Sequence, residues 1–496
     1  MVVNGAWWVG VLYLGMVGLL GLLVVAVPYF RIQVVDSGTG GGVPLVELRT
    51  VSGERYWTDS AGVVAFDEPG LMGREVFFFV RSHGYEVPAD GFGYRGVRLQ
   101  AEAGKSATVR MTRLNIAERL CRLTGQGIYR DSVLLGEKTP LKQPVLAGGV
   151  VGQDTAQAVI YRGRMLWFWG DTDRTGYPLG NFHTTGAVAT FAQGGVDFGF
   201  DYHYFTGQDG FVRPMVDSKE SMPIWISGLT VLGKGKDESL HAYYAQMRRL
   251  GEVASSGYLK WNDQAERFDI AQTFAKDRGW RYLDGHLVND EGRLMGNLPP
   301  NVRVKADWGA MQDASAYEAF TPLDAEGNVR RVNGKADYVW QKSAGPLDAR
   351  AEQQLVQKGD LKREEAHFLP RDAQGDTILP HGGSVQWNPY RKRWVMIFTR
   401  FGGKDSALGE IYYSEASAPT GPYLRAVKII THDKYTFYNP VHYAFLDRDG
   451  GRTIYFEGTY TAEFSGNEDK TPRYNYNQIF YKLDLSNPRL KFAQGG

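Results

Sequence analysis

Two aspartates stand at the open end of a predicted β-hairpin. The stretch 152–186 reads GQDTAQAVIYRGRMLWFWGDTDRTGYPLGNFHTTG, an apolar run, a turn at Arg162-Gly163 and a second run rich in aromatic residues. If these two residues form the turn, cross-strand partners have positions that sum to 325, as Asp154 and Asp171 do. Residues directly opposite each other in an antiparallel pair share a face, with Cβ atoms about 4.5–5.5 Å apart. The pattern therefore predicts two neighbouring carboxyl groups.

Neighbouring carboxylates repel each other, which raises the pKa of at least one of them. Such a pair is retained mainly where chemistry, a metal ion or a basic partner uses it. The alternative is that both aspartates cap strand ends in solvent, a common role of this residue. Spacing alone leaves these two interpretations open.

The elements that must position this pair are expected to be short strands. The chain has 496 residues, 61 of them glycine and 13% aromatic, and long helical periodicities are scarce, which favours a mainly β protein. The formal net charge is +1 without a polybasic tract, so nucleic acid is not expected as a partner. The single cysteine, Cys121, cannot form an internal disulfide and is expected to be buried and inert.

The first thirty residues predict a membrane anchor. No charged side chain occurs between Gly5 and Phe30, which is long enough for a transmembrane helix, and aromatic residues stand near both ends. A cleavable signal peptide is the alternative, but its apolar core is usually only about 7–15 residues long. We therefore expect residues 1–30 to be an uncleaved anchor that makes the membrane a partner. The rest of the chain is then expected outside the cytoplasm.

Residues 31–113 contain short alternating runs separated by Gly, Pro, Asp and Ser, as in a small antiparallel β-sandwich. The segment VVDSGTGGGVPLVELRTVSGERYWTDSAGVVAFDEPG resembles the carboxypeptidase regulatory-like, or transthyretin-like, domains. That resemblance implies a spacer without catalytic groups. Residues 114–147 are expected to be a helical linker, with Asn115 as N-cap, Gly125 as C-terminal stop and Cys121 on the packed face.

From residue 148 to 496 the hairpin pattern recurs. Similar units begin near Gly152, Met222, Gly382 and Pro440, and residues 285–368 leave room for one more. Repeated short antiparallel strands predict an all-β fold, a five-bladed β-propeller that follows the sandwich and the transmembrane helix. A pair of β-sandwiches and a β-helix are the alternatives.

The run GQDTAQAVIYRGRMLWFWGDTDR resembles the opening blade of five-bladed glycoside hydrolase propellers. It is most similar to the DUF4185 group, which includes endo-D-arabinanases, and more distantly to arabinanases and levansucrases. This resemblance implies catalytic roles for Asp154 and Asp171 and a carbohydrate substrate, with arabinofuranose polymers among the candidates. The insertion 234–320 departs from the family pattern.

Glycoside hydrolysis requires a proton donor and a carboxylate that acts as nucleophile or base. A pair held by one hairpin suits the retaining separation of about 5–5.5 Å, whereas an inverting enzyme needs about 6.5–9.5 Å and a more distant acid. Candidates for a third acid are Glu318, Glu457 and Asp173. A turn centred on Asp449-Gly450 would pair Glu457 with His442, and a buried structural salt pair is the alternative there.

Other polar and aromatic residues are candidates for substrate binding at the mouth of the propeller. Loops at such a mouth commonly bind ligands, histidine there is more often a core residue than an ion ligand, and tryptophan can stack on sugars or pack between blades. The candidates are Asp173, Arg174, Tyr177, His183, Trp225, Trp308, His381 and Trp387. We predict no metal and no cofactor. The alternative function is a non-catalytic propeller that binds glycan or protein at the cell surface.

Overall fold

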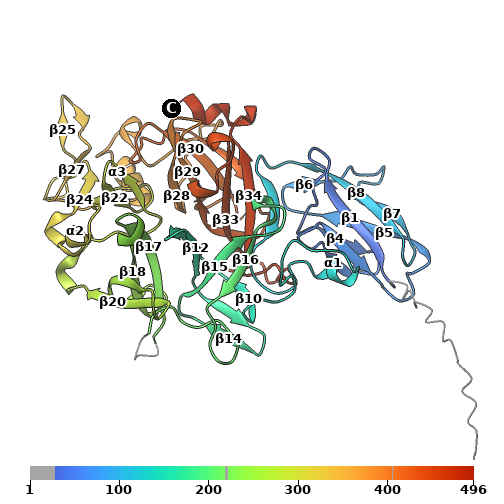
Figure 1. The fold of residues 1–496 in the computed structure, drawn as a ribbon. Coiled ribbons are helices and arrows are strands. Elements are labelled where there is room, and N and C mark those ends of the chain that lie inside the picture. Colours follow the sequence, from blue (N-terminus) through green and yellow to red (C-terminus); the bar gives the residue numbers. More distant parts are fainter. Residues whose placement is uncertain (1–27, 218–221, 405, 496) are drawn as a thin grey trace, which may run out of the picture.

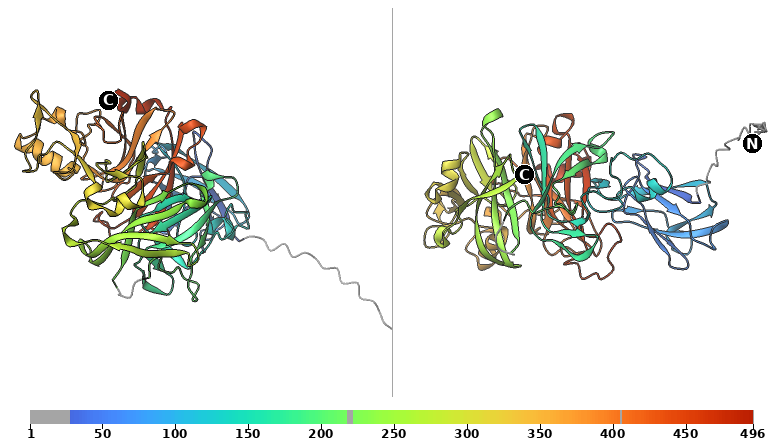
Figure 2. Two further views of the ribbon diagram at one scale, coloured as in Figure 1. Left: turned by 60° about the vertical axis from the view of Figure 1, so that its left-hand side comes forward. Right: turned by 60° about the horizontal axis from the view of Figure 1, so that its bottom comes forward.

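The computed structural model describes residues 28–217, 222–404 and 406–495 (Figure 1). Within these ranges no helix is both long and apolar enough to cross a membrane. The predicted anchor, residues 1–30, lies almost entirely outside the described residues, so it stays a prediction. The described chain forms a β-sandwich followed by a larger body of small sheets, which lie at opposite ends of the molecule in Figure 2.

The sandwich spans residues 30–113 and consists of two four-stranded sheets with the strand orders β4-β1-β8-β6 and β3-β2-β5-β7. Its strands are β1 (Phe30–Asp36), β2 (Glu47–Thr50), β3 (Arg55–Trp57), β4 (Val63–Phe66), β5 (Arg74–Arg81), β6 (Tyr85–Glu86), β7 (Gly96–Ala101) and β8 (Ser106–Arg113). Apolar side chains of both sheets form one core, as alternation in the sequence predicts. The expectation of a wholly antiparallel sandwich is wrong, because β1 and β8 pair in parallel.

The predicted helix between Asn115 and Gly125 is wrong. Residues Glu118–Arg122 form strand β9, which pairs with β34 (Asn477–Asp484) at the other end of the chain. Tertiary contacts override local helix propensity here, because β34 offers a free edge and the buried Arg119 donates to the carbonyl of Pro44 at 3.1 Å. The only α-helix in the linker is α1 (Arg130–Leu134). Cys121 is buried, as expected.

In the described part of the remaining chain, five sheets of four or five strands follow one another, and we number them I to V. Sheet I contains β11 (Gln157–Tyr161), β12 (Arg164–Trp169), β15 (Thr185–Phe191) and β16 (Phe200–Tyr204). Sheet II contains β17 (Ile224–Leu232), β18 (Ser239–Arg249), β19 (Glu252–Asn262) and β20 (Arg267–Thr273). Sheet III contains β21 (Val288–Asp290), β22 (Arg293–Gly296), β23 (Val302–Lys305), β24 (Glu318–Thr321) and β27 (Val339–Gln341).

Sheet IV contains β28 (Pro380–Asn388), β29 (Arg393–Arg400), β30 (Ile411–Ala416) and β31 (Ala426–Ile430). Sheet V contains β32 (Thr436–His442), β33 (Thr453–Thr461), β34 and the early strand β9. Smaller elements are β10 (Val150–Gln153), β13 (Thr172–Arg174), β14 (Tyr177–Asn181), β25 (Arg331–Val332), β26 (Lys335–Ala336), α2 (Trp308–Gln312) and α3 (Ala349–Lys358). The predicted units near 152, 222, 382 and 440 and the unit within 285–368 each correspond to one sheet.

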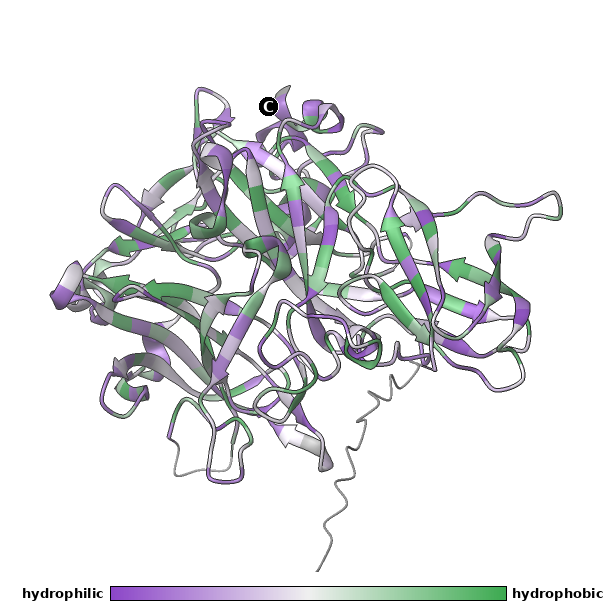
Figure 3. Cartoon of the chain, turned by 45° about the vertical axis from the view of Figure 1, so that its right-hand side comes forward, coloured by the Kyte–Doolittle hydropathy of each residue, from purple (hydrophilic) through white to green (hydrophobic). Residues whose placement is uncertain are grey.

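Consecutive sheets pack face to face through shared apolar clusters, and a last cluster joins sheet V back to sheet I. One cluster joins sheets I and II, and similar clusters join II to III, III to IV and IV to V. The cycle closes where Trp167 of sheet I packs with Val441 and Phe480 of sheet V. Figure 3 shows this distribution, with hydrophobic residues on the strands and hydrophilic residues on many of the connecting loops. Apolar contacts therefore link the five sheets in chain order and lead from sheet V back to sheet I.

Candidate active site

The hairpin of sheet I has the predicted register. Pairs such as Gln157–Phe168 and Tyr161–Arg164 obey the sum of 325, and both turn residues have positive φ, 48° at Arg162 and 74° at Gly163. This is the backbone of a two-residue type I′ turn, which fixes the register of a hairpin. The rule extends to the open end, where the amide of Asp154 donates to the carbonyl of Asp171 at 3.2 Å. The predicted pairing of the two aspartates is confirmed.

Both aspartates lie where the hairpin changes sheets. Beyond them the same two chain segments continue as β10 and β13 of a separate three-stranded sheet with β14. Gly170 packs under the Asp154 carboxyl, and a Cβ at this position would lie 2.3 Å from Asp154 Oδ1. Position 170 therefore admits no side chain while Asp154 keeps its place.

Tyrosines of sheet V hold Asp154. The hydroxyl of Tyr438, on β32, donates to Asp154 Oδ2 at 2.7 Å. Burial raises the pKa of Asp154 to about 6, while the hydroxyls of Tyr438 and Tyr476 favour the charged form and limit that rise. Asp154 is thus a carboxyl group that can change its protonation state near neutral pH.

A tryptophan of sheet II holds Asp171. The indole Nε1 of Trp225, at the start of β17, donates to Asp171 Oδ1 at 2.9 Å. Burial raises the pKa of Asp171 to about 7, and the negative charge of Asp154 adds to the effect. Near neutral pH the pair can therefore hold one proton between two carboxyl groups, which is the state that acid–base chemistry needs.

Two further acids, Asp173 and Glu463, lie near the pair. Asp173 lies opposite Gly152 in the neighbouring strand pair, and its pKa is raised by burial and lowered by Lys470. Glu463, in the loop that follows β33, is close enough for its charge to raise the pKa of both Asp154 and Asp171. Sequence reasoning missed Glu463, because nothing in the local pattern after β33 shows where that loop folds.

A pocket of about 560 Å³ begins beside Asp154, although neither aspartate is among the residues that line it. Thr155, next to Asp154 in sequence, is in its wall and accepts a hydrogen bond from Asn439 Nδ2 at 3.0 Å. Every sheet or its preceding loop contributes to the lining, which consists of Thr155, Gln157, Ser227, Asp284, Gly285, His286, Asn297, Leu298, Asn301, Pro346, Asp348, His381, Gly382, Gly383 and Asn439. We call it the central pocket. Its walls are rich in groups that can bind hydroxyls.

The predicted pairing of Glu457 with His442 is wrong. Glu457 pairs with Val441, and His442 pairs with Phe456, one residue out of the expected register. The connection from β32 to β33 contains two 3-10 turns instead of a two-residue turn, so it does not impose the assumed sum. Glu457 is fully buried and accepts a hydrogen bond from Trp167 Nε1 at 2.8 Å. It lies in the core between sheets I and V.

Glu318 and the remaining candidates lie in varied surroundings. Glu318 is paired with Arg303 at 2.8 Å and with Arg293 at 3.5 Å. His381 is exposed, lines the central pocket and stacks on Phe401 with ring centroids 6.0 Å apart. Trp387 lies next to the turn of its hairpin, at the far end of β28 from Pro380. The structure thus brings His381, but not Trp387, to the central pocket.

The candidate residues that follow Asp171 in the loop make different contacts with neighbouring residues. Arg174 bonds Asp209 at 3.2 Å and stacks on Phe211. His183 Nδ1 accepts from the amide of Ile224 at 3.3 Å, and burial lowers the pKa of this histidine. Tyr177 is 63% exposed, whereas Trp308 stacks on His241 at 4.3 Å between sheets II and III.

Metal-ligand groups are sparse. Among the described residues, no three His, Cys, Asp or Glu side chains are arranged to hold a metal ion.

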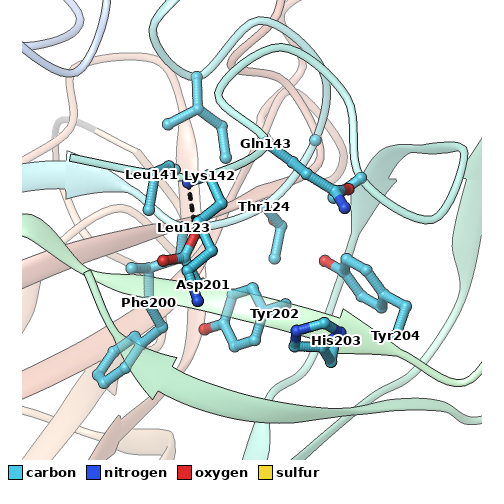
Figure 4. Close-up of a pocket in the computed structure, with 13 residues that line it drawn as sticks. Leu123, Thr124, Leu141, Lys142, Gln143, Phe200, Asp201, Tyr202, His203 and Tyr204 are labelled. Atoms are coloured by element: carbon cyan, nitrogen blue, oxygen red, sulfur yellow. Dashed lines mark hydrogen bonds between the residues drawn. The ribbon is translucent and has the colours of Figure 1, made fainter. Parts of the chain in front are cut away.

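A second, smaller cavity of about 70 Å³ lies between β16 and the linker (Figure 4). There the amide of Lys142 donates to Asp201 Oδ1 at 2.7 Å. Asp201 is the only acid among its lining residues, so this cavity offers no pair of carboxyl groups. One residue of this cavity nevertheless contacts the candidate site. The hydroxyl of Tyr204 donates to Oε1 of Gln153, the residue before Asp154 in the sequence, at 2.9 Å.

Comparisons with known proteins give distant structural neighbours. No known family profile and no curated protein sequence matches the chain. A candidate hydrolase from Bacteroides ovatus is 11% identical, with a TM-score of 0.44 over 69% of this chain and 88% of its own. A candidate exo-β-1,3-galactanase from Bifidobacterium bifidum S17 is 10% identical, with a TM-score of 0.37 and coverages of 74% and 92%. An N-acetylgalactosamine deacetylase from F. plautii is 9% identical, with a TM-score of 0.38 and coverages of 77% and 99%.

Proposed function

We propose that this protein is a glycoside hydrolase that cleaves a polysaccharide or glycoconjugate. The observation that carries the proposal is the Asp154–Asp171 pair, two partly buried aspartates that meet at the end of one hairpin beside a polar pocket, with the pKa of each raised toward neutrality by desolvation. Hydrolysis of a glycosidic bond needs one carboxylic acid and one carboxylate at the same centre.

The two aspartates have different proposed roles. Asp171, with the higher pKa of about 7, is the general acid that protonates the leaving oxygen. Asp154, held by two tyrosines, is the carboxylate that acts as nucleophile or as base for a water molecule. The O–C1 bond breaks, the leaving group departs as an alcohol with the proton of Asp171, and water supplies the new hydroxyl at C1. With Asp154 as nucleophile, the remaining proton of that water goes to the Asp171 carboxylate, whereas with Asp154 as base it goes to Asp154.

The central pocket is the proposed binding site for a sugar unit. Its volume of about 560 Å³ falls within the range of about 300–1,000 Å³ typical of small-ligand sites. Polar side chains from different sheets converge there, among them Gln157, Asn297 and His381. These side chains would hydrogen-bond the sugar hydroxyls and so orient the ring. The glycosidic bond would then lie at the edge of the pocket, next to the acid pair.

The finer predictions about fold and location belong to the same proposal. The cyclic packing of sheets I to V supports a five-bladed propeller that β9 closes by completing sheet V. We propose that it is related to the DUF4185 group, that the sandwich is a transthyretin-like spacer, and that residues 1–30 anchor the protein with its sheets outside the cytoplasm. Protease treatment of cells whose outer envelope has been opened while the cytoplasmic membrane stays intact should then degrade residues 148–496, and protection of that region would contradict a periplasmic or cell-surface location.

A substrate screen tests the function. Full-length protein is incubated with linear arabinan, arabinogalactan, β-1,3-galactan and levan, and new reducing ends are measured from pH 4 to pH 9. We expect release from at least one polymer with a rate maximum near pH 6–7, because lower pH protonates Asp154 and higher pH ionises Asp171. Binding of a polymer without turnover at any pH would contradict the hydrolase and favour a glycan-binding propeller.

A further inference from the structure

The loop after β33 is anchored at both ends beside the acid pair. The amide of Ala462 donates to Asn475 Oδ1 at 2.8 Å, and Ser465 Oγ donates to the carbonyl of Ala462 at 2.6 Å. Further along, Asn467 Nδ2 donates to the carbonyl of Lys434 at 3.1 Å. These hydrogen bonds fix the conformation of residues 462–467, which we call the 462–467 loop.

Phe464 is the exposed aromatic residue of this loop. Its side chain is 61% exposed, although burying a phenylalanine stabilises a protein by roughly 1.5–3 kcal/mol. Its φ is +60°, a region that a bulky residue seldom adopts and that costs about 1–3 kcal/mol. An exposed ring on a strained but well-bonded backbone is better explained by a ligand than by folding.

The position of the ring connects it to the chemistry. The ring centroid of Phe464 is 6.2 Å from that of Tyr438, with an interplanar angle of 73°. The hydroxyl of the same Tyr438 bonds Asp154 at 2.7 Å, and the residue before Phe464 is Glu463. A sugar that lies on the outer face of Phe464 would therefore be next to a sugar held at the acid pair.

We propose that Phe464 is a stacking platform that holds a neutral sugar ring next to the acid pair and so determines which glycans are bound. This inference rests on the proposed function only in taking the ligand to be a glycan. The C–H faces of pyranose and furanose rings pack on aromatic rings, while their hydroxyls point to the rim. The surrounding charges favour neutral glycans over polyuronates, because four acids, Asp154, Asp171, Asp173 and Glu463, lie together and Lys470 offsets the charge of Asp173 and Glu463.

Affinity electrophoresis of the full-length chain tests this platform. The gels contain arabinogalactan, linear arabinan, β-1,3-galactan, levan or polygalacturonate. We expect at least one neutral polymer to retard the wild type, and Phe464→Ala to weaken that binding about tenfold, about 1.4 kcal/mol. Phe464→Trp should bind like the wild type. The matched control is Phe92→Ala, which removes a phenylalanine that is 89% exposed on the sandwich.

Phe464→Gly separates the ring from the backbone strain. Glycine accepts a φ of +60° without cost, so this variant keeps the loop and removes only the ring. It should lose affinity as Phe464→Ala does. The proposal is overturned if both variants bind like the wild type, if Phe92→Ala weakens binding equally, if polygalacturonate binds best, or if no neutral polymer retards the wild type. Weaker binding by Phe464→Ala in a protein that never releases sugar would sustain the platform while the hydrolase proposal fails.

Discussion

The acid pair and Glu457 share an electrostatic property but differ in their surroundings. Burial raises the pKa of Glu457 to about 7, the same value as that of Asp171. Glu457 is fully enclosed between sheets I and V, where the indole of Trp167 bonds it. Asp154 and Asp171 lie at the break between two sheets, next to a pocket.

The comparison teaches that a raised pKa does not identify a catalytic acid by itself. Desolvation is the largest cause for all three carboxyl groups. What separates them is a second acid within range and a position at a break between two sheets beside the central pocket, which the pair has and Glu457 lacks. The predictions below break or sharpen this contrast, from the largest expected effect to the smallest.

The largest effect is expected from the acid pair. Asp154→Asn and Asp171→Asn keep the size and hydrogen-bonding capacity of each side chain but remove its charge. Each should lower kcat on an identified substrate by about 10²–10⁴, the usual contribution of acid–base catalysis. The melting temperature should stay within about 3 °C, because the amide oxygen can still accept the hydrogen bonds from Tyr438 and Trp225 and the cost of burying a carboxylate is removed.

The double variant sharpens this test. Because the two groups share one proton, Asp154→Asn combined with Asp171→Asn should lose far less than the product of the single losses. Fully multiplicative losses would show that the two aspartates act independently. Nearly full activity in either single variant would contradict its assigned role.

Gly170→Ala tests whether the position of Asp154 matters as well as its charge. The new Cβ would lie 2.3 Å from Asp154 Oδ1, so the carboxyl must move. A displacement of about 1 Å at a reacting group can cost about 10²-fold in rate, and we expect kcat to fall by about 10–10². Gly163→Ala, at the opposite end of the hairpin, is the stability control, since its Cβ has open space but its φ is +74°. It should lower the melting temperature without changing kcat, and a normal kcat in Gly170→Ala would contradict the tight packing.

Glu457→Gln should change stability and its pH dependence but not kcat. The folded-state pKa of about 7 exceeds the ordinary value of 4.5, so the native state binds more protons than the unfolded state between these values. The free energy of unfolding of the wild type therefore falls as pH rises from about 4.5 to about 7, by roughly 3 kcal/mol from this group. The variant lacks this loss and should be the more stable protein at pH 8, as urea unfolding would show. If Glu457→Gln remained stable but lost kcat, Glu457 would have a catalytic role like that of the acid pair, which contradicts this prediction.

The sequence predicts the acid pair because a local feature sets its register. A two-residue turn at Arg162-Gly163 fixes the pairs from Tyr161–Arg164 to Gln157–Phe168, and the amide of Asp154 still meets the carbonyl of Asp171 beyond them. The same reasoning is wrong by one residue at Glu457, where the longer connection sets no register in advance. A one-residue slip moves a side chain to the other face of its strand.

Non-local structure explains what the sequence leaves unpredicted. Strand β9 carries a helix-like pattern, and only the free edge of β34 makes it a strand. The loop that carries Glu463 and Phe464 is held in place because Asn475 Oδ1 accepts from the amide of Ala462 and Asn467 Nδ2 donates to the carbonyl of Lys434, contacts that no short-range pattern predicts. Trp225 could be predicted as an aromatic residue of the mouth, but not as a hydrogen-bond donor to Asp171.

The smallest effect is expected at Glu318, which, unlike the acid pair, is held in ion pairs with arginines. Arg303 and Arg293 both contact its carboxylate, whose side chain is 22% exposed. Partly exposed ion pairs contribute about 0–1 kcal/mol, so Glu318→Gln should lower the melting temperature by no more than about 3 °C. Because both arginines contact this carboxylate and Glu318 is not among the residues that line the central pocket, kcat should stay within about twofold of the wild type. Arg303→Met removes a partner of the same ion pair and should reproduce the small loss of stability with the same unchanged kcat. A large drop in kcat for Glu318→Gln, with an unchanged melting temperature and a normal Arg303→Met variant, would identify Glu318 as the proton donor and leave Asp171 as an acid that only tunes Asp154.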